Sequence, residues 1–252
     1  MKRVVLCAFL LLFVMCGFVS AGQFGPTEPT ASPGKFSLET GYFWNDTKWK
    51  MDYIDDFRTQ SNQFYVQASF APTKSLEIFG RLGGADLSTK GTVNNMSDTS
   101  NMFGTIGGKA MLYQHGIFGF GAFAQGTHYF SDYKDNVNLS QYGGFPVNVA
   151  MTDYYDVQGG LSGQVKVQNF ILYGGGFWYY AQAHVNVSTP IGVAPPFLGS
   201  ISLQLLSEKL REQNAFGGFM GVKVPLTKRF SVNVEGQLRD RISGGMSLVY
   251  AF

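Results

Sequence analysis

The sequence predicts an all-β protein, a closed antiparallel transmembrane β-barrel of ten strands, with eight strands as the alternative. Three observations lead there: a secretory leader, apolar residues at every second position, and connections that are alternately short and long. Charged residues make up only 14% of the chain, and no stretch after residue 21 has the apolar length of a membrane helix. A soluble β-sandwich would carry a more charged outer face, so the barrel is favoured.

Residues 1–21 have the three parts of a signal peptide. Lys2 and Arg3 precede an uncharged apolar run, and small residues ending at Ala21 mark the expected cleavage site. Cleavage there removes both cysteines, so the mature chain must be stable without disulfides. It also leaves 17 basic against 17 acidic residues, a balance that gives no reason to expect a nucleic-acid partner.

The mature chain divides into a linker and one barrel domain. Residues 22–34 contain three prolines and are predicted to be a flexible N-terminal linker, and residues 35–252 form the barrel. On the first strand Phe36 and Leu38 share one face, while Ser37 and Glu39 share the other. This period of two is typical of a strand with two different faces.

The connections indicate the topology. Tight turns are expected at 72–75, 114–116, 167–169 and 225–228. The longer polar connections are expected at 46–62, 86–101, 130–151 and 184–214, with a very short one near 239–241. Outer-membrane barrels have short periplasmic turns and long extracellular loops, so both termini are expected on the periplasmic side. Eight strands would result if 184–224 were misassigned.

Residues 201–213 have two possible conformations. Leu203, Leu206 and Leu210 would share one face of a short helix that caps the barrel mouth. An extended strand end is the other possibility.

The C-terminal strand carries the most specific pattern. Met246, Leu248, Tyr250 and Phe252 alternate with smaller residues up to a terminal aromatic. This looks like the signal that outer-membrane barrels present to the barrel-assembly machinery, and with the hairpin at 72–77 the chain resembles the broad group of small OmpA-like and opacity-like outer-membrane barrels. The resemblance implies a bacterial outer-membrane location, contact with membrane lipid and lipopolysaccharide, and periplasmic chaperones during biogenesis. It identifies no subfamily and no surface ligand.

The polar face of the strands carries charges that would line the lumen and pair there, because an unpaired buried charge is costly. The set is Glu39, Glu77, Arg81, Lys109, Asp156, Lys166, Lys223, Glu235 and Arg239. Phe79, Trp178 and Tyr180 are also expected to point inward and to narrow the bore. We therefore expect a largely plugged lumen, a structural or surface-interaction role and at most small-ion conductance; a narrow porin for small solutes is the alternative.

A hydrolase at the barrel rim is a distant third possibility. His128 and His184 are placed near the long-loop ends of strands, where Asp132, Asp135 or Asp153 could approach His128. No nucleophile motif accompanies them and the histidines lack metal-ligand spacing. We expect no enzymatic activity, catalytic residue, cofactor or metal.

Aromatic residues crowd the expected strand ends, as in the interfacial girdles of membrane barrels, and a ligand-stacking surface is the alternative. They are Tyr42, Trp44, Trp49, Tyr53, Phe57, Tyr129, Phe130, Tyr154, Tyr155, Trp178, Tyr179 and Tyr180.

Overall fold

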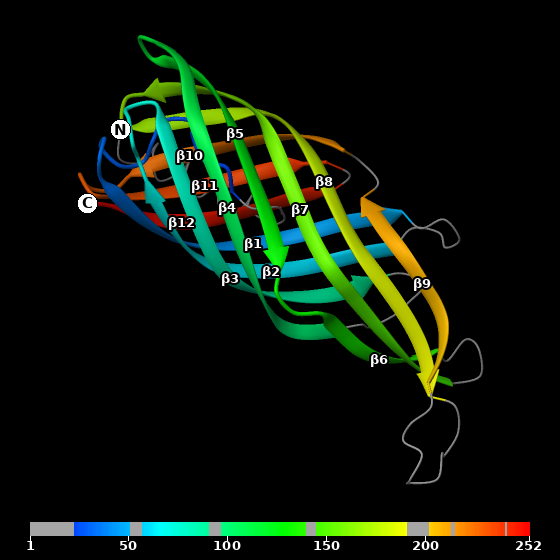
Figure 1. Cartoon of the computed structure of the whole chain (residues 1–252). Coiled ribbons are helices and arrows are strands. Elements are labelled where there is room, and N and C mark those ends of the chain that lie inside the picture. Colours follow the sequence, from blue (N-terminus) through cyan, green and yellow to red (C-terminus); the bar gives the residue numbers. More distant parts are fainter. Residues whose placement is uncertain are drawn as a thin grey trace, which may run out of the picture.

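The computed structural model describes residues 23–50, 57–90, 97–139, 145–190, 202–212, 215–239 and 241–252, and they form a closed antiparallel barrel (Figure 1). The expected leader at 1–21 lies outside the described residues. The strand segments are β1 (Phe36–Lys50), β2 (Phe57–Phe70), β3 (Leu76–Lys90), β4 (Ser97–His115), β5 (Phe118–Tyr129), β6 (Tyr133–Leu139), β7 (Phe145–Val167), β8 (Phe170–Pro190), β9 (Ser202–Glu212), β10 (Phe216–Pro225), β11 (Phe230–Leu238) and β12 (Ile242–Ala251).

These segments build ten wall strands, which confirms the predicted number. The order around the barrel is β1-β2-β3-β4-β5-β7-β8-β10-β11-β12, and β12 pairs with β1 from Ser37↔Ala251 to Trp44↔Gly244 to close it. β6 follows β5 on the same side of β7, and β9 and β10 both pair with β8. β5 and β6 together therefore form one interrupted wall strand, and β9 and β10 together form another. Closure leaves no free edge in the wall, as a bilayer requires.

One end of the barrel carries the short turns, at 71–75, 116–117, 168–169 and 226–229; we call it the short-turn end and the opposite one the long-loop end. Gly116 and Gln168 have positive φ values of 57° and 52°, which close two of these turns tightly. Towards the long-loop end the strands run well into the segments expected to be loops, and β7 alone has 23 residues. Polar Thr, Ser and Asn residues continue the ladder there because only backbone groups pair.

The possible helix at 201–213 is instead a strand. β9 pairs with β8 from Gln182↔Arg211 to Pro190↔Ser202. β8 extends beyond its pairing with β10, and β9 satisfies the backbone groups that would otherwise be unpaired on this edge. Within the described ranges no helix is long and apolar enough to span a bilayer.

The outer surface carries an apolar band bounded by aromatic residues at both edges. At the short-turn edge, Phe36 lies 4.8 Å from Phe70 and Phe230 lies 4.9 Å from Tyr250, measured between ring centroids. At the other edge, Tyr42 lies 4.8 Å from Phe64. Between the two edges the outward side chains include Leu38 and Val66, which are exposed and apolar, as in the apolar band of membrane barrels.

Beyond the band the wall continues with fewer strands. The β11–β12 hairpin ends at Leu238↔Ile242, and past it β9 pairs directly with β1 at Trp49↔Glu212 and Lys50↔Arg211. The segments β6, β7, β8 and β9 therefore project from the long-loop end as an extension of the barrel (Figure 1). Outward residues of β1 and β2 beyond the band are polar as well, and Arg58 and Gln60 both donate hydrogen bonds to Asp46.

Candidate functional site

The lumen is filled by the chain's own N-terminal segment. Residues 23–27 and Ala31 are buried inside the barrel, and the segment leaves it at the short-turn end, where residues 32–35 are exposed before β1 begins. The expectation of a loose linker over 22–34 therefore does not describe residues 23–31, which we call the plug. Its prolines restrict the backbone of a segment that bends at 27–28 and at 30–31, and wall residues far away in the sequence hold that segment in place.

Phe24 anchors the plug in an aromatic pocket. Its ring centroid lies 4.1 Å from that of Phe123, 4.9 Å from that of Phe219 and 5.0 Å from that of Phe177. These three residues come from β5, β10 and β8, so Phe24 joins separate parts of the wall. Full burial of a phenylalanine side chain contributes about 1.5–3 kcal/mol.

The backbone beside Phe24 is bound by a buried carboxylate. Glu235 on β11 accepts the N–H groups of Phe24, at 3.0 Å, and of Gly25, at 2.8 Å, and it also accepts the side-chain amide of Gln237. Gly25 has a φ of +71°, which favours glycine and lets both N–H groups point at one carboxylate. Glu235 thus receives several hydrogen bonds that compensate for its burial.

Gln23 joins the plug to a second group of lumen residues. Its carbonyl accepts from Arg81 at 3.1 Å, and its side-chain oxygen accepts from the Tyr65 hydroxyl at 3.0 Å. Tyr65 also hydrogen-bonds Glu39, and the Arg81 guanidinium lies 4.3 Å from the centre of the Tyr65 ring. Gln23 is therefore held by residues of β2 and β3, and Tyr65 connects it to Glu39 of β1.

Two ion pairs hold the plug nearer the short-turn end. Glu77 and Lys109 are direct cross-strand partners with 3.2 Å between their charged atoms, both are buried, and Glu77 also accepts the N–H of Thr30. Lys166 pairs with Glu28 at 2.7 Å and is half-exposed. Gln164 accepts from the Glu28 N–H and donates to the Glu28 carboxylate.

The other predicted lumen charges also lie on the inner face. The Asp156 carboxylate accepts from Gln158, and Lys223 on β10 is the cross-strand partner of buried Asn233 on β11. Arg239, at the end of the short hairpin, lies 3.8 Å over the ring of Tyr179 and donates to Thr47.

A second closure lies towards the long-loop end. Trp49 on β1 and Tyr154 on β7 lie on strands that are not neighbours, because β9 and β8 come between them at this level of the wall, and their ring centroids are only 5.5 Å apart. Tyr154 stacks on Tyr129 at 4.2 Å, and Tyr133 packs against both. We call these four buried residues the aromatic seal. They cross the lumen where the membrane band ends, and Leu210 and Met151 are buried with them in one apolar cluster.

The expected orientation of the β8 aromatics is wrong by one residue. Trp178 is 42% exposed on the outer face and Tyr180 also points outward, whereas Phe177 and Tyr179 are buried in the lumen. Phe79 does point inward, as predicted. Trp49, Tyr129, Tyr154 and Tyr179, which were expected in the girdle, are interior instead. Tyr53 lies outside the described residues, as does the side chain of Phe57.

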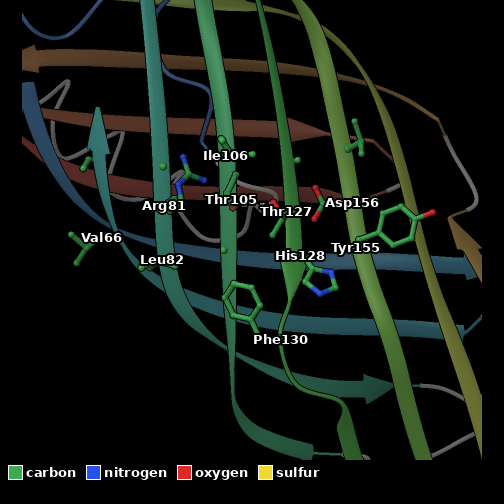
Figure 2. A pocket seen from close by; sticks show the side chains of 15 residues that line it. Val66, Arg81, Leu82, Thr105, Ile106, Thr127, His128, Phe130, Tyr155 and Asp156 are labelled. Carbon is green, nitrogen blue, oxygen red and sulfur yellow. Dashed lines mark hydrogen bonds between the residues drawn. The ribbon is translucent and has the colours of Figure 1, made fainter. Parts of the chain in front are cut away.

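The rim histidines are not brought together with a shared carboxylate. His184 lies 3.6 Å from Asp153, Asp132 pairs with Lys134, and the His128 ring packs against Phe130. Figure 2 shows His128 and Phe130 beside an apolar groove of about 760 Å³. Exposed Val66, Leu82 and Ile106 line this groove, so it lies on the membrane-facing side of the wall. Within the described ranges no group of His, Cys, Asp and Glu could hold a metal ion.

Comparisons with known proteins agree on the fold. No protein-family model and no curated protein matches the sequence. Among solved structures, the translocator domain of the autotransporter NalP from Neisseria meningitidis is 10% identical, with a TM-score of 0.51 over 99% of this chain and 96% of that one. The outer membrane protease OmpT from Escherichia coli is 12% identical, with a TM-score of 0.48 over 90% of this chain and 100% of that one.

The outer membrane protein OprG from Pseudomonas aeruginosa is 10% identical, with a TM-score of 0.40 over 88% of this chain and 99% of that one. At such low identity these likenesses bear on architecture and not on activity. The likeness to the NalP translocator domain supports a membrane β-barrel architecture and gives no preference to the OmpA-like and opacity-like members. The chain shares the fold of bacterial outer-membrane β-barrels.

Proposed function

We propose that the protein is a closed outer-membrane barrel with a structural or surface-interaction role and no open solute pathway. The contact between Trp49 and Tyr154 is the observation that carries this proposal, because it spans the interior between two strands that β9 and β8 separate in the wall. The plug closes the other half of the lumen independently. A barrel of ten strands lies close to the size at which side chains fill the interior, so two closures leave little free bore.

The surface role is supported by the strand extension beyond the membrane band. Its interior contains buried Trp49, Met151, Val185 and Leu210, so it has an apolar core of its own. In the proposed orientation this extension is extracellular and presents an ordered surface. Structured surfaces bind partners at a lower entropic cost than flexible loops do.

Planar-bilayer conductance and liposome swelling test the closed lumen. We expect no steady conductance and no sugar uptake from the wild-type barrel. Trp49→Ala with Tyr154→Ala opens the aromatic seal by removing two of its four rings, and deletion of residues 23–31 removes the plug. We expect each change alone to leave the lumen closed to sugars and the combination to conduct small ions, because only the combination removes both barriers.

Trp178→Ala with Tyr180→Ala is the matched control, since these aromatics lie on the same wall but face outward. This variant should stay closed to ions and sugars both with and without the deletion of residues 23–31. Heat-modifiable gel migration should verify that each barrel is folded. Oligosaccharide uptake by the wild-type protein would contradict the proposal and favour a narrow porin.

A further inference from the structure

We propose that the short-turn half of the lumen is a peptide-binding site whose resident ligand is the plug, and that it accepts a peptide of the same chemistry from solution. The proposed ligand has an aromatic anchor followed by a glycine. This inference rests on the proposed function, because it requires the plug to be seated in a closed lumen.

The wall supplies a formed pocket for the aromatic anchor. Phe123, Phe177 and Phe219 surround the Phe24 ring, and they also contact one another: the Phe123 and Phe219 centroids are 5.5 Å apart, and those of Phe177 and Phe219 are 6.2 Å apart. The pocket is therefore made by wall residues alone. An aromatic side chain in a preformed pocket is the usual energetic centre of peptide recognition.

The wall also binds main-chain groups of the plug. Glu235 accepts the N–H groups of Phe24 and Gly25, Gln164 accepts the N–H of Glu28, and Glu77 accepts the N–H of Thr30. Arg81 donates to the carbonyl of Gln23. Hydrogen bonds to the main chain provide affinity for an extended peptide, and side-chain pockets provide its specificity.

The lumen is accessible from one end. The plug meets β1 through exposed residues 32–35, and the Gly34 N–H donates to the carbonyl of Ala71 at the short-turn end. The aromatic seal closes the other end of the lumen. A peptide must therefore enter and leave at the short-turn end. Residues 32–35 tether the plug to the wall and give it an effective concentration of about millimolar order. The intact chain should therefore exclude peptide from solution.

The experiment cuts this tether after folding. A protease site is inserted between Pro33 and Gly34, the barrel is refolded, cut and washed, and mass spectrometry follows release of the fragment. The probe is a synthetic peptide of residues 22–33 with a fluorophore at its C-terminal end, which should remain outside the lumen. We expect saturable binding by anisotropy to the cut barrel and none to the uncut barrel. Slow release of the fragment would appear as slow exchange with the probe, which also supports the proposal.

Two changes define the specificity. The Phe24→Ala peptide should bind about a hundredfold more weakly, since it loses the anchor. The cut Glu235→Gln barrel should bind the unchanged peptide about tenfold more weakly, because hydrogen bonds to a charged acceptor are lost. A barrel cut at the same site inserted between Thr73 and Lys74, in an exposed turn, keeps its plug and should bind no peptide.

Three results would overturn the proposal: no binding to a cut barrel that has lost its fragment, equal binding to cut and uncut barrels, or equal affinity for the Phe24→Ala peptide. None of them depends on conductance. Solute passage through the wild-type barrel would instead overturn the closed lumen, so the two failures can be distinguished.

Discussion

Lys109→Met should lower the free energy of unfolding by about 3–5 kcal/mol, because it leaves the Glu77 carboxylate charged and buried without its ion-pair partner. Glu77 is 1% exposed and Lys109 6% exposed, so water cannot replace the lost charge. Glu77 also binds the Thr30 N–H, so the change should loosen the plug as well. Urea unfolding of protein refolded into lipid vesicles measures the change.

Two matched variants separate the buried charge from the loss of a lysine. Lys166→Met breaks the half-exposed pair with Glu28 and should cost at most about 1 kcal/mol. Adding Glu77→Gln to Lys109→Met removes the stranded charge and should recover much of the loss. If Lys109→Met and Lys166→Met had equal effects, the assignment of a buried ion pair would be wrong.

Leu161→Arg should cost about 2–4 kcal/mol, because it places a charge on the membrane-facing side of β7 near the middle of the apolar band. Leu161 is 53% exposed there, whereas its neighbour Ser162 is 1% exposed and faces the lumen. Urea unfolding in lipid vesicles is again the measurement, and the same experiment in detergent should show a smaller cost.

Ser88→Arg is the control, since Ser88 lies on the outward face of β3 beyond the aromatic edge of the band. The expected cost falls to about 0–1 kcal/mol near and beyond the interface. A penalty at Ser88 as large as that at Leu161 would place the membrane boundary elsewhere on the wall.

The wall was predictable because its signal is local. On β2, Phe64 and Val66 are exposed and Tyr65 is buried, as expected from the period of two. The strand ends were less predictable, because polar residues such as Thr47 and Thr59 are typical of loops. In the structure these two residues are cross-strand partners and continue the ladder through their backbone groups.

The direction of the β8 aromatics was not predictable from the residues around them. Phe177, Trp178, Tyr179 and Tyr180 are consecutive and follow three glycines, so polarity does not alternate to indicate which face is inner. The pairing with β7 decides it, because Phe177 is opposite Gly160 on the inner face. Little room is left there: a Cβ added at Gly160 would lie 2.9 Å from the Phe123 ring.

The plug was missed for a different reason. Its proline-rich sequence is typical of a linker, and its partners are remote: Phe24 binds Glu235, which is 211 residues away. No periodic pattern indicates a contact of this separation. The buried acid on β11 was identified from the sequence, but its binding partner was expected to be a basic side chain and is instead the backbone of the plug.

Hydrogen exchange at the plug amides tests the central claim most directly. The N–H groups of Phe24, Gly25, Glu28 and Thr30 donate to wall side chains inside the lumen, whereas the Ser75 N–H lies in an exposed turn and provides the fast reference. If the plug fills the lumen, the Phe24 and Gly25 amides should exchange at least roughly a thousandfold more slowly than that of Ser75 in the folded, vesicle-bound protein. Exchange of the plug amides as fast as Ser75, with the wall strands still protected, would contradict the account.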